Sequence, residues 1–325
     1  MALALGGGGA RGYAHIGVIQ ALEERGCDIV GVSGTSMGAL VGGLHAAGRL
    51  PEYAEWIRGL SQRDVIRLID PSLRTPGVFR GSKVMARVID LLAGVRIEDL
   101  PIPFTAVATD LLARKEVWFQ RGPLEVAIRA SIALPSVFTP VMLNGRLLAD
   151  GGMTNPIPLA PLAAIHADAT VAVSLSGEAD EGLGRSPAQE SSEPLPAAEW
   201  QARARNSASQ VLEREAVRRV TGWFGGGRGD EAATDTEELV VEPAEDVFTA
   251  LPSGLGTLDV MELSLDALQS VVTRYRLASY PPDLLISIPK QACRTLDFHR
   301  GAEMIALGRK ITDEALDGAA LTSDR

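Results

Sequence analysis

The sequence lacks the features that define several large classes of protein. It has 325 residues and only two cysteines, Cys27 and Cys293, which stand far apart and in no metal-ligand spacing. This excludes a disulfide-rich scaffold and fits a reducing compartment. No run of about 18 apolar residues is present to span a bilayer, and the first residues lack the basic region of a signal peptide. We therefore expect a cytoplasmic protein that is soluble or peripherally attached to a membrane.

Positive charge is also scarce. The chain has 31 Lys and Arg against 41 Asp and Glu, a formal net charge of −10. Residues 178–250 hold 16 of the acidic side chains and 7 arginines, so this segment alone carries 7 − 16 = −9. Such a balance disfavours general binding to nucleic acids. The hydrophobic content of 46% is ample for one large core.

Residues 1–176 alternate between strand-like and helical segments, a rhythm that is typical of an α/β fold. We expect a three-layer fold in which a mainly parallel central sheet is flanked by helices. The predicted strands are residues 2–5, 29–33, 104–109 and 169–174, and the predicted helices are residues 13–25 and 37–47.

The rest of the chain divides into two parts. Residues 177–250 are rich in Gly, Pro, Ser and acidic residues, which indicates an insertion and not a second domain. Within it, residues 197–224 form a predicted basic amphipathic helix. Two interpretations of this helix stay open: peripheral contact with an anionic membrane, or a packing or oligomer contact. Residues 251–325 are expected to complete the first domain through a helix at 258–277, a strand at 284–288 and a helix at 301–316.

A glycine-rich loop occupies residues 6–12, between the first predicted strand and the first predicted helix. Consecutive glycines allow several backbone N–H groups to point at one spot, which suits an anion. The spacing of Gly7, Gly9 and Gly12 formally fits a dinucleotide-binding fingerprint. However, the acidic residue expected at the end of the second strand is missing, and so is the lysine of a phosphate-binding loop. The competing interpretation is an oxyanion hole.

The candidate nucleophile is Ser36. It is the central residue of a G-x-S-x-G pattern, flanked by Gly34 and Gly38, and it stands between a predicted strand and a predicted helix. This is the context of a nucleophile elbow, a sharp turn that lifts the serine hydroxyl above the sheet edge. The two glycines permit that turn. The alternative is a glycine-rich turn without chemistry, which the preceding glycine loop makes the weaker interpretation.

A serine hydroxyl needs a base within hydrogen-bond reach. The chain has four histidines, and we expect a structural or surface role for each of them. Asp150 is the better candidate, because it follows a short apolar strand at 146–149 and precedes two glycines that leave it accessible. Partial burial there would raise the pKa of Asp150 and make it a stronger base than a solvated aspartate.

Four blocks of the sequence resemble those of patatin-like phospholipases, and they occur in that family's order and approximate spacing. The resemblance covers about residues 1–176. It continues weakly in 271–316, where the chain is similar to bacterial and neuropathy-target-esterase-like members. The blocks are the glycine loop at 6–12, the G-x-S-x-G pattern at 34–38, residues 130–140 and the Asp-Gly-Gly sequence at 150–152.

The resemblance implies a serine acyl hydrolase that cleaves ester bonds of lipids, a (lyso)phospholipase or esterase. In it, Ser36 is the nucleophile and Asp150 the base of a Ser-Asp dyad, and neither a metal nor a cofactor takes part. Two alternatives stay open: an acyltransferase that uses the same dyad, and a nucleotide-binding or regulatory module that uses the glycine loop without hydrolysis. The resemblance further implies an oxyanion hole formed by backbone N–H groups of Gly7, Gly8 and Gly9, with Arg11 ordering that loop.

Overall fold

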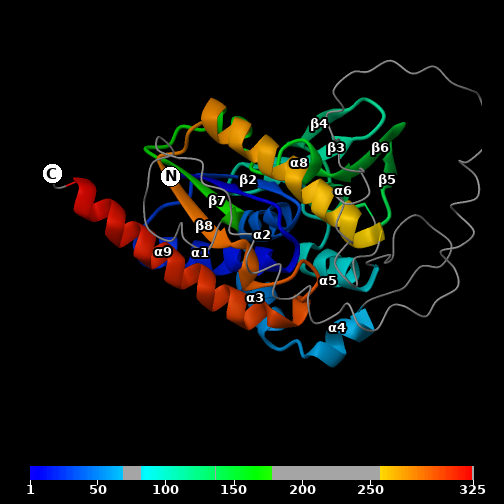
Figure 1. Cartoon of the computed structure of the whole chain (residues 1–325), viewed down its shortest axis with the longest axis horizontal. Coiled ribbons are helices and arrows are strands. Elements are labelled where there is room, and N and C mark those ends of the chain that lie inside the picture. The colour runs from blue at the N-terminus through cyan, green and yellow to red at the C-terminus, as the bar shows by residue number, and fades with distance from the viewer. Residues whose placement is uncertain (69–81, 136, 178–256, 324–325) are drawn as a thin grey trace, which may run out of the picture. The chain divides into compact units, whose positions relative to one another are not determined.

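The computed structural model describes residues 1–68, 82–135, 137–177 and 257–323 (Figure 1). The chain divides into two compact units, one made of Met1–Ser186 and Glu262–Arg325 and the other of Pro187–Met261. The first unit holds the fold described below, apart from residues 257–261. The predicted insertion at 177–250, with its basic helix at 197–224, lies outside the described residues except for its first residue, and it stays a prediction.

An eight-stranded mixed sheet forms the centre of the first unit. Its strands are β1 (Ala2–Leu5), β2 (Gly31–Thr35), β3 (Phe104–Asp110), β4 (Lys115–Phe119), β5 (Val141–Leu143), β6 (Arg146–Asp150), β7 (Thr170–Gly177) and β8 (Leu284–Pro289). Their order is β5-β6-β3-β2-β1-β7-β8, and β4 pairs with β3 beside this path. The pairs among β1, β2, β3, β7 and β8 are parallel, whereas β4, β5 and β6 pair antiparallel.

Helices flank this sheet. The α-helices of the described residues are α1 (Ala14–Glu24), α2 (Met37–Ala46), α3 (Leu50–Arg58), α4 (Gln62–Leu68), α5 (Ser82–Leu92), α6 (Leu124–Ser131), α8 (Thr257–Ser279) and α9 (Gly301–Ser323). Two short 3₁₀ helices adjoin the candidate site, η1 (Gly9–Tyr13) and η3 (Gly151–Met153).

Strand β1 shows how the sheet divides the core. Successive side chains of a strand point to opposite faces. Leu3 and Leu5 belong to the large apolar cluster that also contains residues of α1, α2 and α9. Ala2 and Ala4 belong to a second, smaller cluster, against which Leu277 of α8 packs. The sheet is therefore covered on both faces, and the predicted three-layer α/β fold with a mainly parallel sheet is confirmed.

Helices α1 and α9 pack with their backbones in close contact. A Cβ placed on Gly17 of α1 would lie 1.9 Å from the carbonyl oxygen of Ile305, and one placed on Gly308 of α9 would lie 2.1 Å from that of Ala14. No side chain fits at either distance, so this helix crossing requires glycine at both positions.

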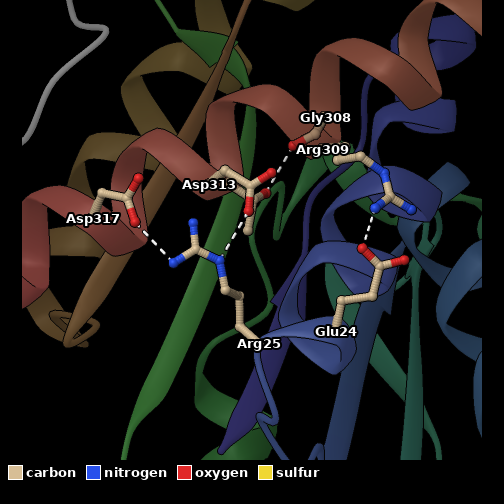
Figure 2. Close-up of polar contacts among 7 residues, drawn as sticks. Glu24, Arg25, Gly308, Arg309, Asp313 and Asp317 are labelled. Atoms are coloured by element: carbon tan, nitrogen blue, oxygen red, sulfur yellow. Dashed lines mark hydrogen bonds and ion pairs between the residues drawn. The ribbon is translucent and has the colours of Figure 1, made fainter.

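Ion pairs flank the same crossing (Figure 2). Arg25 lies 3.2 Å from Asp313 and 2.8 Å from Asp317, and Arg309 pairs with Glu24. All five side chains are more than a third exposed to solvent, and such pairs typically contribute about 0–1 kcal/mol each. The close backbone packing, together with buried apolar residues of both helices such as Ile19 and Ile305, therefore holds α9 on α1 more than these ion pairs do.

The elements differ from the prediction at a few places. The predicted strand at 29–33 begins and ends two residues too early, because the parallel ladder with β1 starts where Ala2 pairs with Gly31. Strands β4 and β5 were not predicted. Their side chains are exposed or half-buried, so these short antiparallel strands carry little hydrophobic signal in the sequence.

Candidate active site

Ser36 occupies a sharp turn between β2 and α2. Its backbone has φ 56° and ψ −122°, a conformation that residues other than glycine seldom adopt. A Cβ on Gly34 would lie 2.3 Å from the carbonyl oxygen of Gly38, and a Cβ on Gly38 would lie 2.1 Å from that of Leu5. The two glycines of the G-x-S-x-G pattern are thus required by the close packing of this turn against itself and against β1.

The Ser36 hydroxyl donates a hydrogen bond of 2.5 Å to Oδ2 of Asp150. Asp150 ends β6 and is 2% exposed, and its Oδ1 accepts the N–H of Gly152 at 2.7 Å. Burial raises the pKa of Asp150 to about 6, although the hydrogen bonds from Ser36 and Gly152 act in the opposite direction. The pair therefore combines a serine hydroxyl with a carboxylate whose pKa lies close to neutral, as a general base requires.

The register of β3 explains why these two residues meet. Strands β2 and β6 pair with successive stretches of β3: Thr35 lies opposite Val107, and Asp150 lies opposite Ala108. The last residue of β2 and the last residue of β6 are consequently neighbours along one strand. Ser36 follows directly, so the sheet itself brings together two residues that are 114 positions apart in the sequence.

Ser131, at the end of α6, supports the strained turn. Its hydroxyl accepts the N–H of Ser36 at 2.9 Å and donates to the carbonyl oxygen of Val107 at 2.6 Å. Ser131 is fully buried. Ser131 belongs to the block at 130–140, but its role is not readable from the sequence because its contact with Ser36 depends on tertiary packing.

The glycine loop lies directly beside the nucleophile. A Cβ placed on Gly7 would be 3.3 Å from Cβ of Ser36. The N–H of Gly7 is engaged, since it donates to the carbonyl oxygen of Pro156 at 3.1 Å. The N–H groups of Gly8 and Gly9 make no comparable backbone contact in the described part of the chain. Of the three glycines predicted for an oxyanion hole, Gly8 and Gly9 are thus the two with an N–H left to donate.

Arg11 ties this loop to the rest of the fold. Its side chain is buried, Nε donates to the carbonyl oxygen of Leu175 at 3.1 Å, and Nη1 donates to that of Cys293 at 2.9 Å. Leu175 belongs to β7 and Cys293 to the segment before α9, so one guanidinium spans two elements that are far apart in the sequence. That Arg11 orders the loop for catalysis stays a prediction.

Histidine is the usual base beside a catalytic serine. Within the described residues, none of the four, His15, His45, His166 and His299, forms a hydrogen bond with either partner. His15 is fully buried and its Nε2–H donates to the carbonyl oxygen of Gly6 at 2.8 Å. Because burial lowers the pKa of His15 to about 4, the ring is neutral at physiological pH. The hydrogen bond from His15 therefore holds Gly6, the first residue of the glycine loop, in place.

In the ranges that the structure describes, no group of three or more His, Cys, Asp or Glu side chains is arranged to hold a metal ion. No helix in the same ranges is long and apolar enough to cross a membrane.

The fold and this site define an α/β protein with a buried serine–aspartate pair at a nucleophile elbow. The model of the family described as "Patatin-like phospholipase" matches residues 3–163. "Uncharacterized NTE family protein Rv1063c" of Mycobacterium tuberculosis is 48% identical over 341 residues, which span 100% of this chain and 93% of that protein. The chain belongs to the patatin-like phospholipase family.

More distant relatives share only part of the chain. Human "Patatin-like phospholipase domain-containing protein 6" is 35% identical over 56% of this chain and 14% of that protein. "Neuropathy target esterase sws" of Drosophila melanogaster is 32% identical over 56% of this chain and 13% of that protein. Among solved structures, VipD from Legionella pneumophila aligns with a TM-score of 0.43 and 14% identity, over 97% of this chain and 66% of that one.

Proposed function

We propose that this protein is a serine acyl hydrolase that cleaves ester bonds of lipids, as a (lyso)phospholipase or esterase. The observation that carries the proposal is the 2.5 Å hydrogen bond from the Ser36 hydroxyl to buried Asp150, formed at a strained nucleophile elbow. Membership of the patatin-like phospholipase family supports the choice of an acyl lipid as substrate.

In the first half of the proposed reaction, ionised Asp150 accepts the proton of the Ser36 hydroxyl while Oγ attacks the ester carbonyl carbon. The carbonyl oxygen becomes an oxyanion, and in this proposal the N–H groups of Gly8 and Gly9 stabilise it. Loss of one such donor typically lowers the rate about 10²–10³-fold. The C–O bond to the alcohol then breaks, and Asp150 returns the proton to the departing alkoxide, leaving an acyl ester on Ser36.

In the second half, water replaces the alcohol. Asp150 accepts a proton from water as its oxygen attacks the acyl carbon, and the same glycine N–H groups stabilise the second oxyanion. The bond to Ser36 Oγ breaks, Ser36 regains a proton from Asp150, and the fatty acid leaves. The site needs no third residue for this cycle, because one carboxylate with a pKa of about 6 serves as base and acid in turn.

A fluorophosphonate probe tests the proposal, since it labels only an activated serine. We expect labelling of the full chain, no labelling of Ser36→Ala, and a decrease of roughly 10²–10⁴-fold in the labelling rate of Asp150→Asn. Labelling that survives Ser36→Ala would contradict the proposal, as would a full chain that folds but is not labelled. The second result would favour a regulatory module instead.

The chain offers a matched control in Ser61. Its hydroxyl also donates a 2.5 Å hydrogen bond to an aspartate, Asp64, but this pair is exposed and its reciprocal backbone contacts form a capping box at the start of α4. Ser61→Ala should therefore leave the labelling unchanged. A lipid panel with mass-spectrometric detection then separates hydrolysis from acyl transfer: free fatty acid indicates a hydrolase, and a new acyl ester of an added lysolipid indicates a transferase.

A further inference from the structure

Helix α8 reaches the candidate site from the face of the sheet that carries Ala2 and Ala4. A Cβ placed on Gly152 would lie 2.9 Å from the amide nitrogen of Gln269 and 3.1 Å from Oδ1 of Asp150, so the Gln269 side chain lies close to the proposed base. Helix α8 therefore borders the candidate site and also packs on one face of the sheet.

The inner side of α8 makes several polar contacts beside Leu277, which packs against the smaller apolar cluster. Arg276 donates to Glu116 of β4 at 3.3 Å and to the carbonyl oxygen of Thr154 at 3.2 Å, and Glu116 accepts the side-chain amide of Asn155 at 2.7 Å. These contacts connect α8 to the loop that follows Asp150. Nearer the N-terminus of the helix, Asp266 forms an ion pair with Lys290.

The outer side of α8 is apolar. Leu263, Leu268, Val271 and Tyr275 are 55%, 65%, 46% and 73% exposed. At 100° per residue these four positions lie within about 140° of one another, on the side opposite Gln269. A helix on the surface of a globular protein normally buries its apolar side and exposes its polar side. Helix α8 instead leaves these large apolar side chains exposed on its outer side, which indicates that something else covers them.

The charge on the outer side of α8 favours a lipid surface. The whole helix carries Arg274 and Arg276 against Asp259, Glu262 and Asp266, a net charge of 2 − 3 = −1. At 100° per residue, however, Arg274 lies within the arc of the four apolar residues, whereas the three acidic residues lie outside it. Asp266 is already paired with Lys290, so the exposed Arg274 is the charge that this part of the helix offers to a partner. A cation beside exposed apolar and aromatic side chains is typical of a helix that lies at the interface of an anionic bilayer.

The size of this surface argues against a second copy of the chain. Leu263 and Tyr275 are 12 residues apart, so the strip is about 18 Å long and one helix wide, roughly 200 Å². A specific dimer typically buries about 800 Å² on each partner. A bilayer needs no such area and no shape complementarity, because apolar side chains insert between lipid headgroups.

We propose that the outer side of α8, formed by Leu263, Leu268, Val271 and Tyr275, docks the protein on an anionic lipid bilayer. The inference rests on the proposed function, since it supposes that the substrate is a lipid of that bilayer. Docking through α8 places the loop after Asp150, which the inner side of the same helix contacts, about one helix diameter, ~10 Å, from the membrane surface.

Flotation with vesicles tests the surface directly. The full chain carries Ser36→Ala so that lipid is not consumed, and the vesicles are phosphatidylcholine alone or an equal mixture with phosphatidylglycerol. We expect binding to the mixture. Leu268→Asp with Tyr275→Asp should weaken it at least about 25-fold, because each side chain contributes about fivefold through its buried apolar area. Ile89→Asp, at a side chain of α5 that is 47% exposed, is the matched control and should bind as before.

A second arm of the flotation experiment tests the contribution of charge. Arg274→Ala should weaken binding to the mixed vesicles about fivefold and leave binding to phosphatidylcholine alone unchanged. Unchanged flotation of the double aspartate variant overturns the proposal. Two other results also overturn it, because both place the apolar side within a protein contact. One is a wild-type dimer, measured by light scattering, that the double aspartate variant converts to monomer. The other is a marked decrease in the melting temperature of the double aspartate variant that Ile89→Asp does not show.

The outcomes also separate the two proposals. If fluorophosphonate labels the wild-type chain but this chain does not bind vesicles, the hydrolase proposal stands and the docking proposal is wrong. If the chain binds vesicles through α8 but is not labelled, the docking surface stands and the hydrolase proposal is wrong.

Discussion

Replacing Asp150 by asparagine is expected to stabilise the folded protein at neutral pH while it removes the proposed base. Burial raises the pKa of Asp150 from 3.8 to about 6, so the folded protein binds this proton more tightly than the unfolded chain does. The contribution of the group to stability is therefore full below about pH 4 and is lost as the pH rises to about 6. A difference of about 2 pKa units, at 1.36 kcal/mol each, corresponds to about 3 kcal/mol.

Asparagine keeps the shape of the side chain and cannot ionise. Relative to wild type, the free energy of unfolding of Asp150→Asn should accordingly increase by about 3 kcal/mol between pH 4 and pH 7, and stay constant above that. Urea unfolding at intervals of one pH unit measures this difference. A difference that does not change with pH, or an asparagine variant that is less stable than wild type at pH 8, would refute the reasoning.

Ser36→Ala supplies a matched control for the same titration. It removes a hydrogen bond that lowers the pKa of Asp150 but leaves the carboxyl group buried. The pKa in the folded state should rise further, so the loss of stability between pH 4 and neutral pH should become larger. The two variants thus shift the pH dependence of stability in opposite directions, which a general effect of mutation would not do.

Three other predictions follow from the same contacts. The rate of fluorophosphonate labelling should decrease tenfold per pH unit below about pH 6, as Asp150 takes up its proton, and a profile that stays flat to pH 4 would exclude it as the base. Ser131→Ala leaves the N–H of Ser36 without its acceptor, which should destabilise the fold by about 1–3 kcal/mol and slow labelling, whereas unchanged labelling would limit Ser131 to a packing role. Gly308→Ala should destabilise by at least about 1–3 kcal/mol, while Gly318→Ala, with open space around it in the same helix, should be neutral or stabilising in thermal unfolding.

The sequence predicts the serine–aspartate pair because both residues carry local signals. Ser36 is flanked by two glycines at positions where the turn has no room for a side chain. Asp150 ends an apolar strand and precedes two more glycines. Each of these residue patterns reflects what the backbone of one turn requires, so it can be recognised from the sequence alone. The strand at 146–149 and the helices at 13–25 and 37–47 were predictable for the same reason, since their hydrophobic patterns are local.

The supporting residues were not predictable, since their roles arise only in the folded chain. Ser131 becomes the acceptor of the Ser36 N–H because α6 ends beside β3. The engagement of the Gly7 N–H by Pro156 depends on where the chain runs after Asp150. The exposed apolar side of α8 is equally hidden, because a helical pattern shows an apolar side without showing whether that side faces the core.

Three consecutive residues of β3 hold the parts of the candidate site in register. Val107 pairs with the residue before Ser36 and accepts the Ser131 hydroxyl, Ala108 lies opposite Asp150, and Thr109 donates through Oγ1 to the Asp150 carbonyl oxygen at 2.8 Å. Successive residues of a strand face opposite sides of the sheet, so a slip of one residue between β3 and β6 would turn the carboxylate away from the serine. The 2.5 Å contact between Ser36 and Asp150 is therefore a consequence of sheet register. Strand β3 donates no residue to the proposed chemistry, yet it fixes the distance on which that chemistry depends.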